Sequence, residues 1–379
     1  MMTPNIRDFP LKQFFNEKTS QLAKFGLSPS YCDPMPMAEL LALEPDTLAR
    51  FTQLSTAYTK MNGGEELRQQ ITSVYRSIAP HQIITTSGSD DAIVALFSAL
   101  VNPGDKVVVH VPTYESLSSI AEWRGATLLH WNACEAEAWQ PSLDELAQLL
   151  KQRPRLVVVN FPHNPTGFMP NAQYAQKLID MIDEAGAILV ADEVYRGLAV
   201  TTPVANLLPS FADLSPNVIA FNTMSKAWGL PGLRVGWIAS KNEAAMKLIS
   251  HMRLHFNGYL GTPNEFLTSL ALRHTDAIFA RNATIARTQL AQLHDFMAKH
   301  CKMLAWHAPA DGVVAFPRWL GDIDTDALSR EVLAQTGVLI APSSKFAWGQ
   351  RHLRIGYGVH TFPQALALFD HYLTHLYHS

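Results

Sequence analysis

A lysine closely follows an apolar segment just past the middle of the chain. The sequence there reads Phe221-Asn-Thr-Met-Ser-Lys226-Ala-Trp-Gly-Leu-Pro-Gly-Leu-Arg234. Residues 218–221 predict a strand, and the Gly-Leu-Pro-Gly turn predicts that the lysine amine lies in a loop near the strand end. An amine that is desolvated there can attack an aldehyde and form an imine. Arg234 is a rigid two-pronged cation that suits a phosphate, so the segment favours imine chemistry over the alternative of a surface lysine.

A carboxylate and a tyrosine follow a second apolar segment. Residues 187–191 predict a strand that leads directly into Asp192-Glu-Val-Tyr195. A carboxylate at a strand end can bind a metal, orient a base or pair with a ring nitrogen. The residues alone leave these uses open, beside that of a solvated acid next to a packing tyrosine.

A third segment, Asn160-Phe-Pro-His-Asn164-Pro-Thr-Gly167, follows the predicted strand over residues 156–160. Asn-Pro-Thr-Gly is a common turn sequence, so it predicts a turn at the strand end. We interpret His163 within it as a turn histidine without a chemical role.

The segment Thr86-Ser-Gly88-Ser89-Asp90-Asp91 joins a predicted strand to a predicted helix. Backbone N–H groups at a helix N-terminus bind phosphate, and glycine lets the anion approach closely. Ser89 can add a hydroxyl, while Asp90 is expected to contribute only its backbone, because its carboxylate would repel a phosphate. A capped helix without a ligand is the alternative, since Ser and Asp are frequent N-cap residues.

Taken in their order along the chain, these segments resemble the motifs of the class I/II aminotransferases, the fold-type I pyridoxal 5'-phosphate enzymes related to aspartate aminotransferase. The resemblance spans residues 55 to 360. It implies that Lys226 holds the cofactor as a Schiff base and then carries the proton at the substrate α-carbon. Asp192 would pair with the pyridine nitrogen and make the ring an electron sink. Tyr195 and Asn164 would bind the phenolic oxygen.

The resemblance also implies how the rest of the cofactor is held. Arg234 and Thr223 would contact the phosphate together with Gly88, Ser89 and the Asp90 backbone; the family more often has serine in place of Thr223. Tyr114, in Pro112-Thr-Tyr114, would stack on the pyridine ring, with a packing tyrosine as the alternative. Tyr58 would reach the phosphate of the neighbouring subunit, which implies a homodimer with shared active sites.

An arginine near the C-terminus completes the set. Arg354, in Leu353-Arg-Ile-Gly-Tyr, resembles the residue that clamps the substrate α-carboxylate, with Asn164 as a second substrate contact. Such a pair would position the α-carbon next to Lys226. Arg351 is the rival, but Leu353 and Ile355 alternate with Arg354 in the predicted strand and leave it on the opposite face.

The implied activity is transamination, in which an amino acid gives its α-amino group to a 2-oxo acid through Lys226. The same residues would serve a lyase that eliminates a β or γ substituent, or a decarboxylase. A regulator or structural subunit that binds the cofactor without turnover is a third class. The presence of the complete residue set argues against that class.

The elements that must position these residues alternate along the chain. Short runs rich in valine and isoleucine predict strands at Gln82–Thr85, Lys106–His110, Thr127–Trp131, Leu156–Asn160, Ala187–Ala191, Val218–Phe221 and Val235–Ser240. Amphipathic stretches predict helices between them, among others at Glu65–Ile78, Asp90–Leu100, Ser142–Leu150 and Ala172–Glu184. Such alternation predicts an α/β fold, a three-layer sandwich with a mostly parallel central sheet.

The pattern of predicted helices and strands changes after residue 241. A long helical region to about His300 precedes strand-like pieces at Val313–Pro317, Val338–Ile340 and Leu353–Ile355, with helices at Thr325–Gln335 and Phe362–Tyr377. This pattern predicts a smaller α+β domain built from both chain ends. We therefore expect a large cofactor-binding domain over residues 46–250 and a small domain from residues 1–45 and 251–379, with the ligand between them.

Composition limits the other classes of function. Of the 379 residues, 47% are hydrophobic and 17% charged, as in a packed enzyme rather than a disordered protein. A formal net charge of −3 gives no reason to expect nucleic acid or an anionic membrane as partner. The first thirty residues show no secretory apolar stretch. The three cysteines form no C-x-x-C pair, so we expect no metal site, no disulfide and a cytoplasmic protein.

The motifs do not determine which amino acid is the substrate. The segment Tyr31-Cys-Asp-Pro-Met-Pro-Met37 stands where many relatives have a Gly-x-Pro loop over the substrate. Two groups are candidates to select it: acids for a basic side chain such as a guanidinium (Asp33, Glu17, Glu115), and apolar residues for an apolar pocket (Met35, Met37, Trp228). Solvated acids and core side chains are the alternative for both groups.

Overall fold

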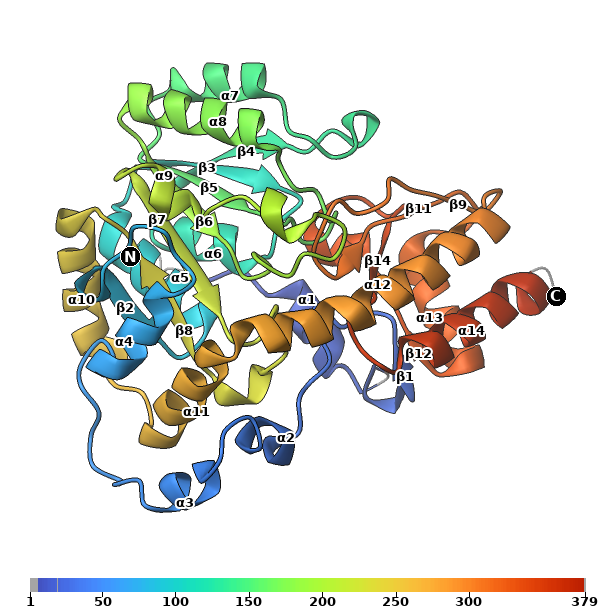
Figure 1. The fold of residues 1–379 in the computed structure, drawn as a ribbon. Helices are drawn as coiled ribbons and strands as arrows, with labels where there is room; N and C mark the ends of the chain where they lie inside the picture. The colour runs from blue at the N-terminus through green and yellow to red at the C-terminus, as the bar shows by residue number, and fades with distance from the viewer. Residues whose placement is uncertain (1–5, 19, 378–379) are drawn as a thin grey trace.

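A computed structural model of the chain describes residues 6–18 and 20–377. Its centre is a seven-stranded sheet with the order β2-β8-β7-β6-β5-β3-β4 (Figure 1). The strands are β2 (Ile83–Thr86), β3 (Lys106–Val111), β4 (Thr127–Asn132), β5 (Leu156–Asn160), β6 (Ile188–Asp192), β7 (Val218–Thr223) and β8 (Gly236–Ala239). Only β8 runs antiparallel to its neighbours, β2 and β7. The predicted mostly parallel α/β sheet is confirmed.

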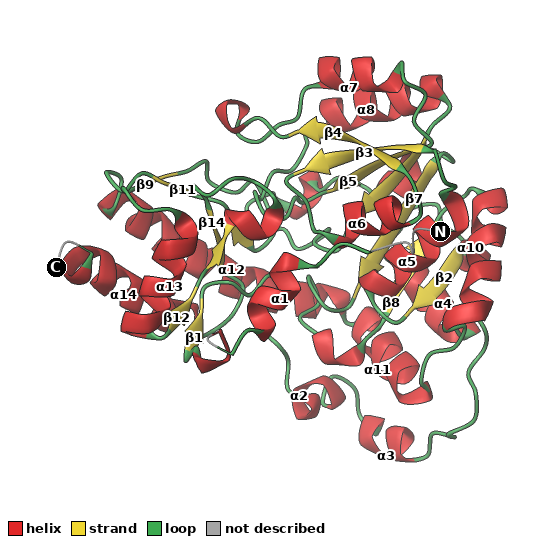
Figure 2. Cartoon of the chain, turned by 180° about the vertical axis from the view of Figure 1, so that it is seen from behind, coloured by secondary structure: helices red, strands yellow, loops and turns green. Residues whose placement is uncertain are grey.

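Helices cover both faces of this sheet, because its inner strands are apolar on both sides. α7 and α8 pack together on one face, and α5 and α6 lie on the other, with α10 against α5 (Figure 2). The helices of this body are α4 (Glu65–Thr72), α5 (Ser89–Leu100), α6 (Ser116–Trp123), α7 (Leu143–Leu150), α8 (Ala172–Ala185), α9 (Phe211–Leu214), α10 (Glu243–Phe256) and α11 (Thr262–Arg273).

The smaller body contains both ends of the described chain. Residues Phe25 and Gly26 (β1) pair in parallel with Val338 and Leu339 (β12). Its other strands are β9 (Leu304–Ala305), β10 (Val314–Ala315), β11 (Arg318–Trp319), β13 (Ala341–Pro342) and β14 (Leu353–Gly356). Its helices are α13 (Thr325–Thr336) and α14 (Phe362–His371), which continues as a π-turn to Leu376. The long helix α12 (Thr275–Lys299) connects the two bodies (Figure 1).

The predicted division of the chain at residue 250 falls within α10. Because α10 and α11 pack against α5 and α4, the large body extends to about Arg273, and the division stays a prediction. Residues 1–5, 19, 378 and 379, which belong to the predicted small domain, lie outside the described residues. None of the helices described has the length and apolarity that crossing a bilayer requires.

Two helix predictions were wrong in extent. The helix predicted over Glu65–Ile78 ends at Thr72, because the backbone N–H groups of Arg76 and Ser77 donate to the Asp213 carboxylate instead of continuing the helix. The region predicted as one long helical stretch is three helices, α10, α11 and α12. The first break contains Gly258 and Gly261, which weaken helix propagation.

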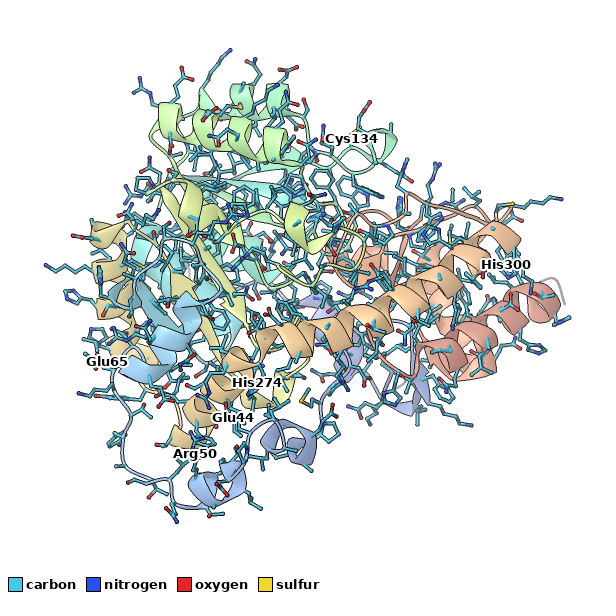
Figure 3. The ribbon with its side chains drawn as sticks, in the orientation of Figure 1. Glu44, Arg50, Glu65, Cys134, His274 and His300 are labelled. Atoms are coloured by element: carbon cyan, nitrogen blue, oxygen red, sulfur yellow. The ribbon has the colours of Figure 1, made fainter. Side chains whose placement is uncertain are left out.

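The remaining short helices belong to the N-terminal segment, which runs along the edge of both bodies: α1 (Pro10–Asn16), α2 (Met37–Leu41) and α3 (Thr47–Thr52). Glu44, between α2 and α3, ties this segment to the end of α11 (Figure 3). Its carboxylate accepts from Arg273 Nε at 2.7 Å, from Arg50 Nη1 at 3.2 Å and contacts His274 Nε2 at 3.1 Å. The Arg273 hydrogen bond is the main reason that the pKa of Glu44 falls to about 2.

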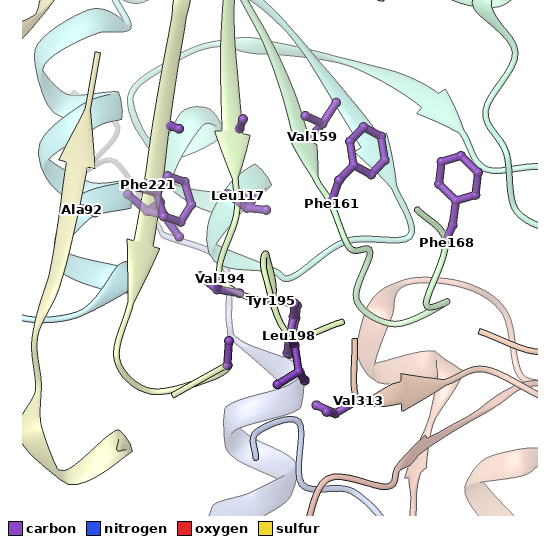
Figure 4. Close-up of a cluster of buried hydrophobic side chains, with 14 of the residues drawn as sticks. Ala92, Leu117, Val159, Phe161, Phe168, Val194, Tyr195, Leu198, Phe221 and Val313 are labelled. Carbon is purple, nitrogen blue, oxygen red and sulfur yellow. The ribbon is translucent and has the colours of Figure 1, made fainter. Parts of the chain in front are cut away.

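The apolar core reaches the carboxyl ends of the parallel strands. Val159 on β5 and Phe221 on β7 are buried there, and Tyr195, Leu198 and Val313 lie below them (Figure 4). Val313 belongs to the smaller body, so the core is continuous between the two bodies at this edge. Residues at the strand ends therefore pack against a close-packed, rigid part of the core.

Candidate active site

The predicted functional residues gather at one edge of the central sheet. Asp192 ends β6, Thr223 ends β7, and Asn164 and Tyr114 lie in the loops after β5 and β3. The ends meet because neighbouring parallel strands finish at the same edge. β2 contributes Gly88 there as well, since two antiparallel pairings through β8 make β2 run in the direction of β7.

A cavity of about 420 Å³ lies at this edge, between the two bodies. Lys226, Tyr114 and Arg354 line it from one side. The other walls come from the N-terminal segment and the smaller body: Leu11, Lys12, Phe15, Gly26, Ser28, Pro29, Ser30, Tyr31 and Leu339. A larger cavity of about 670 Å³, between α1 and α13, is lined by the candidate acid Glu17 but by none of the predicted cofactor or catalytic residues.

Lys226 is half-buried in the turn after β7. Its Nζ donates to Ser30 Oγ at 3.0 Å and lies 5.9 Å from the centre of the Tyr195 ring. Burial lowers the pKa of this amine to about 8, and the positive charge of Arg354 acts in the same direction. About a tenth of the amine is therefore uncharged at pH 7, and this is the form that attacks an aldehyde or takes a proton.

Asp192 lies at the end of β6, and its charge acts on Lys226. It is only 4% exposed, and one carboxylate oxygen accepts from the Val194 backbone N–H at 3.1 Å. Burial raises the pKa of Asp192 to about 7, while the Val194 N–H and the charge of Lys226 lower it. A cationic ring nitrogen beside this acid would supply the partner that a buried carboxylate needs.

Arg354 and Asn164 meet across the two bodies. Arg354 Nη1 donates to Asn164 Oδ1 at 3.2 Å, and Nη2 donates to the Ser28 carbonyl at 2.7 Å. The backbone of Asn164 is held in turn by Asn160 Oδ1 at 2.7 Å. Arg354 Nε is buried without a hydrogen-bond partner in the described part of the chain. An unpaired N–H on a buried guanidinium suits a ligand carboxylate. The rival Arg351 is exposed.

The Tyr195 hydroxyl is already used within the chain. It donates to the Ser30 carbonyl at 2.9 Å, and burial raises the pKa of the phenol. The predicted donation from Tyr195 to a phenolic oxygen therefore stays a prediction. The Asn164 side-chain oxygen accepts from Arg354.

Residues around the start of α5 form a cradle for an anion. Gly88 precedes the helix with φ +96°, and a Cβ placed on it would lie 2.6 Å from Arg234 Nη2. Arg234 also donates to Ser225 Oγ at 3.2 Å, which in turn lies 3.2 Å from Thr223 Oγ1. The open N-terminus of a twelve-residue helix, an arginine and hydroxyl groups make a donor set that fits a phosphate. The site thus fits pyridoxal 5'-phosphate at both its ring and its phosphate.

The acids next to this cradle are occupied by other donors. Asp90 accepts from Lys12 Nζ at 2.7 Å, from the Tyr114 hydroxyl at 3.1 Å and from Ser116 Oγ at 3.2 Å. Asp91 pairs with the buried Arg253. The hydroxyl of Tyr114 is thereby fixed, and its ring faces the cavity.

Tyr58 does not line the cavity and lies at the surface. Its side chain is 90% exposed, and its ring lies 5.2 Å from that of Tyr259. This placement agrees with a residue that acts on a neighbouring subunit, but the role stays a prediction.

Three residues were not predicted from the sequence: Ser30, Lys12 and Ser225. Ser225 stands inside the lysine motif, so its position beside Lys226 was a usable indication. Ser30 and Lys12 belong to no motif.

The candidate selectivity residues do not line the cavity. Asp33 is held by Arg281 and the His360 backbone, and Glu115 by Arg7. Trp228 packs against Phe279.

His163 lies in the predicted turn and is buried there. Its Nε2 lies 2.8 Å from the Pro112 carbonyl and its Nδ1 lies 2.7 Å from Thr166 Oγ1. Because a carbonyl only accepts, Nε2 carries the proton and Nδ1 accepts from the threonine. The ring therefore joins the loop that carries Tyr114 to the turn that carries Asn164.

Comparison with known proteins agrees with this geometry. The family model for aminotransferase class I and II matches residues 27–365. The chain is 35% identical to capreomycidine synthase of Streptomyces vinaceus over 350 residues, which cover 92% of this chain and 88% of that protein. It is 27% identical to aspartate aminotransferase of Thermotoga maritima over 250 residues, or 64% of each chain.

Solved structures share the whole fold. A PLP-dependent aminotransferase from Streptococcus suis superposes with a TM-score of 0.91 at 25% identity, covering 98% of each chain. The PLP-dependent cyclase OrfR superposes with a TM-score of 0.87 at 27% identity, covering 98% of this chain and 99% of that one. The chain therefore belongs to the aminotransferase class I and II family, whose members are enzymes that use pyridoxal 5'-phosphate.

Proposed function

We propose that this protein is an aminotransferase that moves the α-amino group of an amino acid to a 2-oxo acid, with pyridoxal 5'-phosphate held by Lys226. The observation that carries the proposal is that Lys226 and Arg354 line one cavity at the sheet edge where Asp192 ends β6. The Lys226 amine has a lowered pKa, the buried acid Asp192 has a raised pKa, and Arg354 has an N–H without a partner in the described chain. Together they suit proton transfer at the α-carbon of an amino acid.

Each residue has a defined task in this proposal. The bound cofactor supplies a sink for the electrons that the α-carbon releases. Arg354 binds the α-carboxylate and so places the α-carbon beside the amine of Lys226. That amine takes the α-proton and later returns it to the cofactor side. Asp192 keeps a proton on the ring nitrogen, and the cradle at Gly88 and Arg234 anchors the phosphate.

A second candidate is a ring-closing reaction on an amino acid. It is favoured by the 35% identity to capreomycidine synthase over nearly the whole chain and by the fold shared with the cyclase OrfR. The same proton transfer at the α-carbon would begin it, followed by loss of a β or γ substituent. This is the elimination alternative that the motifs leave open, ending in ring closure.

A single-turnover experiment separates the candidates. The holoenzyme is mixed with one amino acid at a time, without any 2-oxo acid, and the products are identified by mass spectrometry. A transaminase releases one 2-oxo acid per active site and continues only when a second 2-oxo acid is added. Steady turnover without a co-substrate, giving a cyclic or eliminated product, would establish the second candidate. The Lys226→Ala variant should do neither.

We also propose a homodimer in which Tyr58 completes the partner's site. Support comes from exposed apolar side chains: the ring of Tyr259 lies 5.2 Å from that of Tyr58, and Met61, Leu254 and Phe256 are exposed as well. Hybrid dimers test the arrangement. Mixing inactive Lys226→Ala chains with impaired Tyr58→Ala chains should recover activity, because one of the two sites in each hybrid then carries neither change. Additive activity without recovery would contradict shared sites.

We place the enzyme in the cytoplasm. Cys134 and Cys301 are exposed free thiols, which a reducing compartment preserves. Fractionation of the source cells with an antibody against the protein would test this placement.

A further inference from the structure

Residues 28–33, which we call the strap, pass between the two bodies beside Lys226. The Arg354 side chain donates to the Ser28 carbonyl, and the backbone N–H of Cys32 donates to the Lys226 carbonyl at 3.1 Å. A Cβ on Gly356 would lie 1.6 Å from the Pro29 carbonyl oxygen, so this approach requires glycine. The strap is therefore held in a defined position against the site.

Ser30 occupies the centre of the strap. Its carbonyl accepts from the Tyr195 hydroxyl at 2.9 Å, and its Oγ accepts from Lys226 Nζ at 3.0 Å. The Ser30 side chain lines the cavity with Lys226 and Arg354. Within residues 6–18 and 20–377, no other hydrogen-bond acceptor is recorded for Nζ.

We propose that Ser30 is a further catalytic residue, whose hydroxyl holds the released amine of Lys226 and stabilises the ammonium that forms when this amine takes the α-proton. The inference rests on the proposed function, since it concerns the same proton transfer. In that step the C–H bond at the α-carbon breaks and an N–H bond forms at Nζ. Ser30 keeps its own proton throughout and acts only as an acceptor.

The direction of the hydrogen bond matters for this role. Because Nζ gives one N–H to Ser30, its lone pair is left free for the α-proton. A donor in the place of Ser30 would instead occupy that lone pair. The serine hydroxyl thus orients the base as well as stabilising its charged form.

The surroundings make an acceptor at this place valuable. Burial and the charges of Arg354 and Arg234 oppose an ammonium on Lys226, while the carboxylates of Asp192 and Asp90 favour it. The Tyr195 ring also lies near the amine, 5.9 Å from Nζ to the ring centre. Neither carboxylate is within hydrogen-bond distance of Nζ in the described residues, so the hydroxyl is the direct acceptor. Hydrogen bonds to charged groups are stronger than those between neutral groups.

Three variants test the role: Ser30→Ala, Ser30→Thr and Ser329→Ala. Ser329 is the matched control, because it is also buried and its hydroxyl donates to a backbone carbonyl, that of Ile340, away from the cavity. Two quantities are measured from pH 6 to 10: the rate of 2-oxo acid release in a single turnover, and the rate at which acetic anhydride labels Lys226 in the cofactor-free full-length chain, read by mass spectrometry.

Without the acceptor the ammonium is less stable, so the pKa of Lys226 falls. In Ser30→Ala we expect the labelling curve and the acid limb of the rate profile to move to lower pH by roughly one unit. The plateau rate should fall roughly tenfold, with little change in KM. Ser30→Thr, which keeps the hydroxyl, should restore both, and Ser329→Ala should move neither.

The inference would be overturned if Ser30→Ala left the labelling curve, the pH–rate profile and the plateau rate unchanged. It would also be overturned if Ser329→Ala shifted the labelling curve and the pH–rate profile by the same amount as Ser30→Ala. A Ser30→Thr variant that behaves like Ser30→Ala would overturn it as well, provided that circular dichroism shows both to be folded. Failure of the proposed function looks different, because the wild-type enzyme would then release no 2-oxo acid. The labelling curves would still decide whether Ser30 sets the proton affinity of Lys226.

Discussion

Arg354 and Asn164 form a hydrogen bond of 3.2 Å between residues that lie 190 positions apart. It joins β14 of the smaller body to the turn that follows β5 of the large body. The bond fixes the guanidinium at the cavity wall while its Nε stays unpaired within the described chain. The relative position of the two bodies thus decides where a substrate carboxylate can bind.

Replacing Arg354 by alanine should weaken binding of the amino acid. Loss of a charge-assisted, two-pronged contact with the α-carboxylate is expected to raise KM roughly a hundredfold. Steady-state kinetics over a wide range of amino acid concentration measures this change. Arg351→Ala is the control, because Arg351 is exposed and its side chain donates only to the Ile323 carbonyl in the described chain. A comparable loss in that variant would contradict our assignment.

Gly88→Ala should weaken binding of the cofactor. The new methyl group would lie 2.6 Å from Arg234 Nη2 at a backbone φ of +96°, so the arginine must leave the cradle. We expect the dissociation constant for pyridoxal 5'-phosphate to rise about tenfold or more. Gly104→Ala separates the two causes, because Gly104 has a φ of +89° and open space around its Cβ position. Titration of both variants with cofactor, followed by tryptophan fluorescence, gives the comparison; equal affinities would refute the cradle.

Asp192 should make the cofactor-free protein less stable as the pH rises. Burial raises its pKa from the ordinary 3.8 to about 7, so between these values the folded state binds a proton that the unfolded state lacks. The free energy of unfolding therefore falls as the pH increases through this window. Urea unfolding at pH 5 and pH 7 should show a smaller difference for Asp192→Asn than for the wild-type chain. An identical difference would show that Asp192 is not protonated on folding.

Glu44→Gln should lower stability at neutral pH. The Glu44 carboxylate is shared by Arg273, Arg50 and His274, and the loss of its charge is expected to cost about 1 kcal/mol. Since the pKa of Glu44 is lowered from 4.5 to about 2, the wild-type contribution is present above pH 4.5 and is lost as the pH falls towards 2. Urea midpoints at pH 7 and pH 3 test this. Glu184→Gln, at an exposed position on α8, should leave both midpoints unchanged.

The sequence by itself determined the sheet and the residues at its strand ends. Apolar runs bounded by turn residues locate a strand to within two residues, as for β6 and Asp192 or β7 and Thr223. Parallel strands end at a common edge, so residues that follow them in the chain must also meet in space. Local patterns therefore were sufficient to predict the positions of Lys226, Asp192, Asn164 and the cradle at Gly88.

The tertiary structure alone decided what touches these residues. Ser30 reaches Lys226 across 196 positions, and Lys12 reaches Asp90 across 78. Helix α4 ends earlier than predicted, because the backbone N–H of Arg76 donates to the carboxylate of Asp213, which lies 137 positions away. Such contacts depend on how helices and strands pack against one another in the folded chain. Neither the hydrophobic period of a helix nor the spacing of a motif predicts that packing. Local sequence patterns thus predict which residue types meet at the site. The packing of the folded chain decides their pKa values and which residues line the cavity.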